Sequence, residues 1–319
     1  MKRLAFVVVA AALAWAGFWF WSAHALRAEI EGWFDARRAE GWQADYTDLF
    51  VRGFPNRLDA TFTDLALADP DTGLAWNAPF FQVLQLVYRP DHAILVFPET
   101  QTVSNEGDVY AIDADGLRAS VVLGDGDTVQ RAGLEADVLN VDGPGHDLAL
   151  AGLTAGLAAV DEATQVYRIG ISADAAAGGV AGGAADGLAL QATIGFDRPW
   201  TRDALESGRP QPTTLDLRTA EYRKGELFLR VAGDLDIDEA GRPTGELALR
   251  AENWRALLDA AVEAGRLPAS LAGTLEQGLA LVAQLSGNPD TLDLPLRFDD
   301  GMVRIGPVPI GEAPRLRLP

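Results

Sequence analysis

An uncharged run near the N-terminus constrains this chain more than any other feature. Lys2 and Arg3 precede a mostly apolar stretch, Leu4–Trp21, which closes on the four aromatic residues Phe18–Trp21. As an α-helix this stretch would be about 27 Å long, close to the thickness of a bilayer's hydrocarbon core. Aromatic rings are typical of the membrane interface, and basic residues before the run favour a cytoplasmic N-terminus. Residues 1–22 are therefore predicted to form a single transmembrane anchor, with the rest of the chain exported.

A cleavable secretory signal is the alternative interpretation of the same run. Ala23, His24 and Ala25 match the small-x-small pattern that precedes a cleavage site. The apolar run is, however, longer than the usual signal core of about 7–15 residues. Both interpretations export the body, to the bacterial periplasm or an equivalent outer compartment. We expect an uncleaved anchor in the inner membrane, with the N-terminus in the cytoplasm and the body in the periplasm.

Composition excludes several classes of function. The chain contains no cysteine, so it has no disulfide framework and no metal-thiolate site. Its formal charge is −20, from 46 acidic and 26 basic side chains. Binding to nucleic acid requires a basic face, and a polybasic grip on anionic lipid headgroups requires clustered Lys and Arg. No nucleic-acid partner is therefore expected, and the simplest meaning of the acidity is solubility.

The periodicity after the anchor predicts a mainly β (α+β) fold. Residues 23–41 are expected to form a short amphipathic helix that ends at Gly41 and either continues the membrane helix or packs under the body. From residue 42 onward the period becomes two, as where Leu58, Ala60 and Phe62 alternate with polar residues. Short strands separated by Asp/Gly turns are typical of an antiparallel sheet that curls over its own core. Residues 42–319 are thus predicted to form a curved, mostly antiparallel, periplasmic β body.

Two segments are expected to interrupt the strands. Residues 173–187 contain only Ala, Gly, Asp and Val, which provide little bulk for a core, and are predicted to be a flexible loop. In the C-terminal third, one helix is expected after an N-cap at Asn253, with Gly265 as its stop. A second helix is expected from Pro268 to Gly287. One side of this helical hairpin is apolar, so we expect it to lie on the sheet.

The histidines and the clustered carboxylates do not predict a metal site. The three histidines, His24, His92 and His146, are isolated and lack ligand spacing. Asp234, Asp236 and Asp238 resemble the start of a calcium loop, but the sixth and twelfth positions of that loop are Glu and Gly here, where it requires Gly and Glu. A strand whose aspartates face water explains the same alternation.

The sequence contains no recognisable catalytic motif. It has no Gly-x-Ser-x-Gly, no Ser-x-x-Lys and no glycine-rich phosphate loop followed by Lys-Ser/Thr. A pair of facing carboxylates that cleaves cell-wall glycans is an open alternative, because the sequence does not determine the distance between two carboxylates. We expect a protein that is not an enzyme and uses no cofactor, with a carboxylate hydrolase as the least favoured alternative.

Aromatic residues are dense in the first half of the body. Their simplest role is in the core, where buried rings dominate the packing energy. The functional alternative is an apolar concavity in the curled sheet that accepts lipid chains. Trp76, Phe80 and Phe81 are the candidates for such a lipid groove.

Several phrases are similar to those of a bacterial envelope family called domain of unknown function 2125. They are Arg52–Asp59 (RGFPNRLD), Leu74–Pro79 (LAWNAP) and Gly301–Pro314, with its Gly-Pro-x-Pro-x-Gly pattern. The family has no established catalytic residues to transfer. Its layout resembles that of AsmA-like envelope proteins, which join an N-terminal anchor to a β-rich periplasmic body and are implicated in lipid handling.

Two hypotheses about what covers the apolar face follow from these observations. The first hypothesis is an envelope protein, held in the inner membrane by Leu4–Trp21, whose apolar face binds lipid. The second is a scaffold or assembly subunit whose apolar face is covered by another envelope protein.

Overall fold

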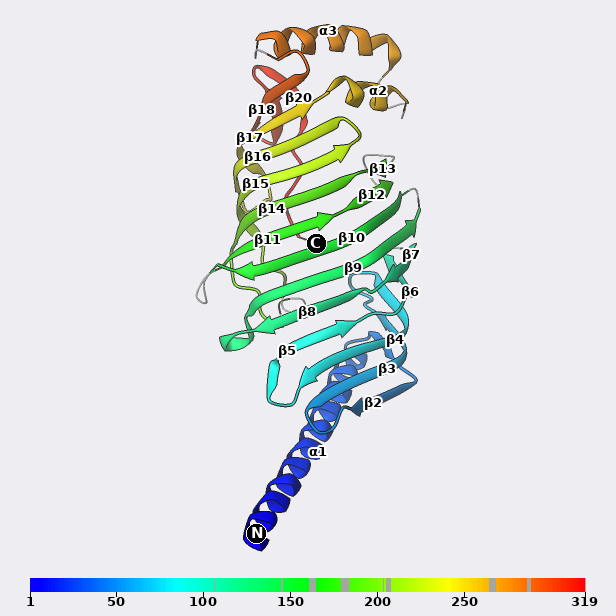
Figure 1. The fold of residues 1–319 in the computed structure, drawn as a ribbon. Helices are drawn as coiled ribbons and strands as arrows, with labels where there is room; N and C mark the ends of the chain where they lie inside the picture. The colour runs from blue at the N-terminus through cyan, green and yellow to red at the C-terminus, as the bar shows by residue number, and fades with distance from the viewer. Residues whose placement is uncertain are drawn as a thin grey trace. The chain divides into compact units, whose positions relative to one another are not determined.

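The computed structural model describes residues 1–105, 107–144, 146–160, 165–178, 184–202, 204, 208–263, 268–285 and 288–318. Within these ranges the chain forms three α-helices and twenty β-strands, and every strand pairing given for them is antiparallel (Figure 1). The mainly β fold is therefore confirmed. The chain divides into two compact units, and each is described by itself. Unit 1 comprises Met1–Leu123 and Gly133–Ala149, and unit 2 comprises Gly124–Ala132 and Leu150–Pro319.

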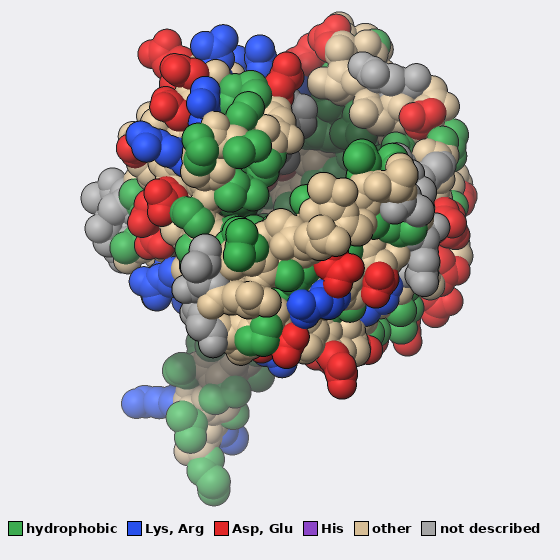
Figure 2. Space-filling model, turned by 90° about the horizontal axis from the view of Figure 1, so that it is seen from above, with side chains coloured by type: hydrophobic (Ala, Val, Ile, Leu, Met, Phe, Trp, Pro, Cys, Tyr) green, Lys and Arg blue, Asp and Glu red, His purple; other side chains and the backbone are tan. Residues whose placement is uncertain are grey.

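Helix α1 (Lys2–Ala39) runs without a break through both the predicted anchor and the predicted amphipathic segment. Among the described residues it is the one helix long and apolar enough to cross a membrane, and 6% of its most apolar 18-residue window is buried. Figure 2 shows the projecting part of this helix covered largely by hydrophobic side chains. A single N-terminal apolar helix is thus compatible with membrane anchoring.

Unit 1 is a twisted sheet that forks. Strand β4 pairs with β3 along its length, but its first residues pair with β6 and its last residues with β5. Strand β5 continues to β8, whereas β6 continues to β7 and then β9. The strands are β1 (Gln43–Asp45), β2 (Asp48–Arg52), β3 (Arg57–Ala68), β4 (Leu74–Leu86), β5 (Arg89–Val96), β6 (Thr100–Asn105), β7 (Asp108–Asp115) and β8 (Arg118–Leu123).

The core of unit 1 lies between the C-terminal half of α1 and one face of β1–β4. Phe34 from the helix is 3% exposed and packs against Ala60 and Phe62 of β3. The predicted alternation over Leu58–Phe62 is confirmed, and it changes phase at Asp64, whose φ is +48°. Beyond this residue the buried positions continue at Leu65.

Unit 2 contains most of the remaining strands, and β9 and β10 have residues in both units. A 3₁₀ turn, Asp125–Asp127, precedes β9. The strands are β9 (Val129–Gly143), β10 (His146–Ala159), β11 (Val166–Ala173), β12 (Ala175–Gly178), β13 (Ala184–Ala185), β14 (Gly187–Phe196), β15 (Pro212–Lys224), β16 (Leu227–Ile237), β17 (Pro243–Glu252), β18 (Thr291–Asp299), β19 (Met302–Ile305) and β20 (Val308–Glu312).

The segment expected to be a flexible loop, 173–187, differs from that expectation. Residues 175–178 and 184–185 form β12 and β13, which pair with each other, while 179–183 lie outside the described residues. The ladder is made by backbone groups, so small side chains do not prevent it.

The helical hairpin consists of α2 (Arg255–Glu263) and α3 (Ala269–Leu285). Both helices pack on the sheet, as expected, α2 through Leu258 and the preceding Trp254, and α3 through Ala283. Asn253 has a φ of +55°, and its side-chain amide donates to the carbonyl of Glu226 at 2.7 Å. The expected stops, Gly265 and Gly287, lie outside the described residues.

Candidate functional site

The register of unit 2 aligns apolar side chains into rows that cross the sheet. Each member of a row is the direct partner of its neighbour on the next strand, so all members lie on one face. One row crosses seven strands from β10 to β18, and we call it the apolar row. Its members are Ala155, Ile171, Leu190, Ala220, Val231, Leu249 and Leu294.

The apolar row is not covered by a helix along its length. Ile171 is 36% exposed, and the other members are partly buried. By contrast, the parallel row next to it contains Leu217 and Leu247, which are 8% and 9% exposed. A run of apolar side chains that stays partly open is unusual for a sheet face that has finished its packing.

Two other elements cover the same face on either side of the apolar row. On one side α2 and α3 pack on the next row, which is formed by Leu229, Ala251 and Leu292. On the other side the C-terminal segment covers the buried cluster through Ala313 and Leu316. The apolar row therefore lies between a helical wall and a C-terminal wall, and we call this strip of the sheet face the trough.

The C-terminal wall is fixed by backbone hydrogen bonds. The Leu316 N–H donates to the carbonyl of Gly241 at 2.8 Å. Gln211 and Leu318 exchange two hydrogen bonds, because the Leu318 N–H donates to the Gln211 side chain and that side chain donates to the Leu318 carbonyl. Figure 2, viewed from the end that carries α2 and α3, shows hydrophobic side chains around a hollow in the surface that faces the viewer.

The three lipid-groove candidates from the sequence lie in unit 1 and do not share one face. Trp76 and Phe81 belong to the aromatic core, with ring centroids 5.1 Å apart, and the Trp76 indole N–H donates to Gln101 Oε1 at 2.7 Å. Phe80 is adjacent to Phe81 on the strand and so points to the opposite side. The structure thus brings Trp76 and Phe81 together and separates Phe80 from them.

Phe80 lines a hollow of about 620 Å³ where the sheet forks after β4. We call it the fork hollow, and Pro79, Val96 and Leu117 contribute to its apolar surface. Charged side chains, including Glu99 and Arg118, also line it. The volume is within the range of small-molecule sites.

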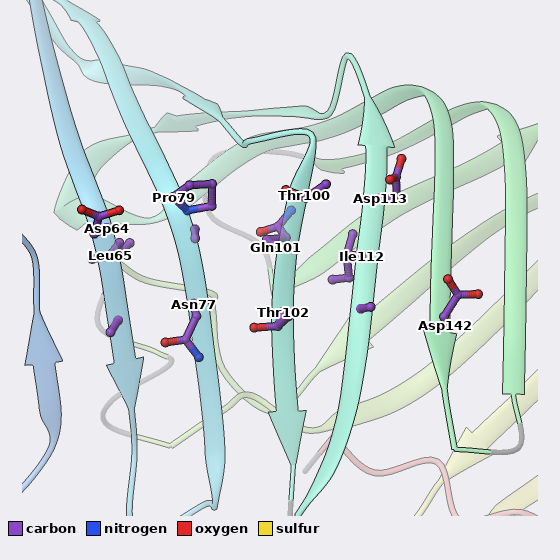
Figure 3. Close-up of a pocket in the computed structure, with 13 residues that line it drawn as sticks. Asp64, Leu65, Asn77, Pro79, Thr100, Gln101, Thr102, Ile112, Asp113 and Asp142 are labelled. Atoms are coloured by element: carbon purple, nitrogen blue, oxygen red, sulfur yellow. The ribbon is translucent and has the colours of Figure 1, made fainter.

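A second hollow in unit 1, of about 630 Å³, is shown in Figure 3. Its wall includes Asn77, Thr102 and Asp142 from one row of paired residues, together with Asp64 and Asp113. This row lies one position from Trp76 and so on the opposite face. Three carboxylates repel anionic lipid headgroups, and we call this the acidic hollow.

Comparison with known proteins identifies the family. A family model described as "Uncharacterized protein conserved in bacteria (DUF2125)" matches residues 19–314. The chain belongs to this family. None of the curated proteins and none of the solved structures matches it.

The phrases that the sequence shares with the DUF2125 family have distinct places in the structure. Gly53–Pro55 forms a loop against helix α1, and the LAWNAP phrase opens β4. Gly301–Pro314 contains β19 and β20, together with the residues that lead into the C-terminal wall.

Within the described part of the chain, no group of three His, Cys, Asp or Glu side chains is placed to hold a metal ion. Asp234 and Asp236 face outward on β16, while Leu235 and Ile237 are 4% and 9% exposed. Asp238 accepts hydrogen bonds from the backbone of the hairpin turn that follows. The strand interpretation of this motif is confirmed.

Proposed function

We propose that this DUF2125 protein is a non-enzymatic, membrane-anchored envelope protein whose trough binds a lipid acyl chain. The observation that carries the proposal is the apolar row, which remains partly open between two covered zones. Helix α1 would hold the protein in the inner membrane, with its basic end in the cytoplasm and its β body in the periplasm.

The dimensions of the trough suit a hydrocarbon chain. Neighbouring strands lie about 4.8 Å apart, so a row across seven strands is about 29 Å long. The acyl chains of one leaflet occupy about half of a 30 Å hydrocarbon core. The floor therefore has room for one extended acyl chain, and burial of apolar surface contributes about 25 cal/mol per Å².

The trough can be tested by filling it without adding charge. In Ala220→Trp an indole would occupy the floor, and the matched control is Ala248→Trp, which places the same ring on an exposed position of the opposite face of the sheet. Both full-length variants and the wild type are purified in the same detergent. Native mass spectrometry and organic extraction then measure the lipid bound per protein.

We expect Ala220→Trp to lose most of the specifically bound lipid and Ala248→Trp to retain it. Lipid that surrounds α1 in the membrane is common to the three samples and cancels in the comparison. Equal lipid content in the three proteins, with native circular dichroism, would contradict acyl binding in the trough.

A specific observation favours a second candidate function, that of a scaffold covered by another envelope protein. Helix α3 buries Ala283 on the sheet but exposes Leu271, Leu275 and Leu281 at 56%, 43% and 60%. We expect a photo-cross-linker at Leu275 to trap one stoichiometric partner in cells if this face is an interface. Diffuse or absent products from this position would count against the scaffold function.

A further inference from the structure

The loop between β2 and β3 is fastened to the part of α1 that is expected to cross the membrane. Phe54, at its tip, is 53% exposed and lies with its ring centroid 5.5 Å from that of Trp19 and 6.0 Å from that of Phe20. Trp19 itself is 5% exposed, because it also packs against Leu58 and Val87. We call Gly53–Arg57 the Phe-Pro loop.

The position of these contacts along α1 sets the depth of the loop. Trp15 lies about 17 Å beyond Leu4 along a helix, and Trp19 about 23 Å. Both distances are shorter than the hydrocarbon core of about 30 Å, and a tilt of the helix shortens them further. If the Phe-Pro loop stayed outside the hydrocarbon, α1 could not span the membrane.

Four of the five carbonyls of the Phe-Pro loop have a donor within the protein. A carbonyl in hydrocarbon needs an internal donor, since no water is present to replace it. Four carbonyls of the loop accept hydrogen bonds of 2.8–2.9 Å, and Pro55 has no N–H to satisfy. The pairs are Gly53 with the Arg57 N–H, Pro55 with the Trp15 indole, Asn56 with the Val87 N–H and Arg57 with the Trp19 indole.

The side chains around the loop fit a lipid headgroup region. Tyr88, in the turn after β4, is 57% exposed and follows Val87, which binds the loop. Three arginines lie at this end of the sheet, at Arg52, Arg57 and Arg89, although the whole chain has a formal charge of −20. Exposed aromatic rings flanked by arginines are typical of the membrane interface.

We propose that the Phe-Pro loop enters the outer leaflet of the membrane that α1 crosses, with Phe54 among the upper acyl chains and Tyr88 at the headgroups. This inference rests on the membrane-anchoring part of the proposed function. It identifies the leaflet as the partner, because α1 and the loop are joined by hydrogen bonds at the same depth. The end of the unit 1 sheet that carries the Phe-Pro loop then lies within the surface of the bilayer, and its hydrogen bonds with α1 are made there.

The absence of cysteine from the sequence permits clean depth measurements. Single-cysteine variants of the full-length protein are labelled with nitrobenzoxadiazole and reconstituted in phosphatidylethanolamine/phosphatidylglycerol vesicles. Asn56→Cys reports on the loop and Ala11→Cys on the middle of the apolar run Leu4–Trp21. Asp71→Cys is the matched control, in the exposed turn at the other end of β3, about 36 Å away. Lipids with a nitroxide on the acyl chain quench labels that lie in the leaflet.

We expect quenching at Asn56→Cys to be several-fold stronger than at Asp71→Cys, with a blue-shifted emission. In the background of Asn56→Cys, Phe54→Asp should lose most of this quenching, because a carboxylate is costly in hydrocarbon. Strong quenching at Ala11→Cys with none at Asn56→Cys would overturn the inference and leave the anchor intact. No quenching at Ala11→Cys would overturn both. Neither result depends on lipid in the trough.

Discussion

At the scale of the residue, glycine decides how closely the strands of unit 2 approach. Gly233 has a φ of +144°, and a Cβ added there would lie 2.3 Å from the carbonyl oxygen of Glu246 on the paired strand. Gly170 on β11 has no heavy atom within 4 Å of the same added atom. The two positions have the same residue type in the sequence, but only one of them requires it.

Gly233→Ala should therefore destabilise the protein by roughly 2 kcal/mol or more, because the backbone is strained and a neighbouring strand must shift. Gly170→Ala is the control and should change the free energy of unfolding by less than about 0.5 kcal/mol. Thermal unfolding of both full-length variants in the same detergent measures the difference. Equal melting temperatures would show that β16 and β17 tolerate the added methyl group.

The ion pair between Arg118 and Glu135 in unit 1 predicts a pH dependence. The hydrogen bond from the Arg118 guanidinium, more than its charge, lowers the pKa of the Glu135 carboxyl below its ordinary value. A group with a lowered folded pKa stabilises the fold above its unfolded pKa, about 4.3 for Glu, and this contribution is lost as pH falls through the folded value.

We expect NMR titration of the Glu135 carboxyl to show this lowered pKa in the wild type and an ordinary one in Arg118→Gln. The effect on stability should be slight, because both side chains are more than half exposed. A Glu135 pKa that does not change in Arg118→Gln would show that the hydrogen bond does not form in solution.

At the scale of the element, the helical hairpin is held to the sheet by one buried ring. Trp254 is 1% exposed, its indole N–H donates to the Pro289 carbonyl at 3.2 Å, and the Arg255 guanidinium lies 4.6 Å from its ring centroid. This contact forms the helical wall of the trough. The sequence predicted the hairpin, but it did not show that Trp254 is the largest side chain buried between the hairpin and the sheet.

Trp254→Ala should cost about 3–5 kcal/mol of unfolding free energy, the usual range for removing a large buried aromatic side chain. Leu271→Ala on the same hairpin, where the side chain is 56% exposed, should change it by less than about 0.5 kcal/mol. Urea unfolding followed by tryptophan fluorescence and circular dichroism separates the two. A Trp254→Ala protein as stable as Leu271→Ala would contradict this account of the attachment.

At the scale of the whole molecule, α1 contains both the candidate membrane span and one wall of the core of unit 1. Phe34 is 3% exposed in that core, and Leu26, Ile30 and Trp33 pack around it. The segment that the sequence predicts to be an amphipathic helix, residues 23–41, is therefore part of the folded unit. A truncated chain that begins after this segment lacks one wall of the core.

Two truncated chains test this double role. A chain that begins at Ala23 keeps Leu26–Phe34 and should fold, although it loses the contact of Trp19. A chain that begins at Gly41 lacks Phe34, whose removal alone is expected to cost about 3–5 kcal/mol. Limited proteolysis and thermal melting should show unit 1 intact in the first chain and degraded in the second. Equal resistance of the two would show that α1 is dispensable for the core.

The three lipid-groove candidates show that the sequence did not predict which side chains of β4 share a face. Strict alternation along β4 would place Trp76 and Phe80 on one face and Phe81 on the other. The break at Asp64 and Pro79, which do not pair although the register is the same on both sides of them, reverses this arrangement, and Asp64 has a φ of +48°. No residue pattern announced the irregularity, since Asp at a positive φ is rare and depends on its surroundings.

The sequence by itself determined the local properties of this protein. The apolar run of α1, the period-two strands and the apolar face of the hairpin follow from the order of polar and apolar side chains, which fixes each element's buried face. Tertiary structure alone decided the apolar row, because its members, from Ala155 to Leu294, become neighbours only through strand register. It also decided the contact between the Phe-Pro loop and α1, since hydrogen bonds from Trp15 and Trp19 join residues about 40 positions apart. Such long-range pairings depend on how elements pack, and local periodicity contains no information about them.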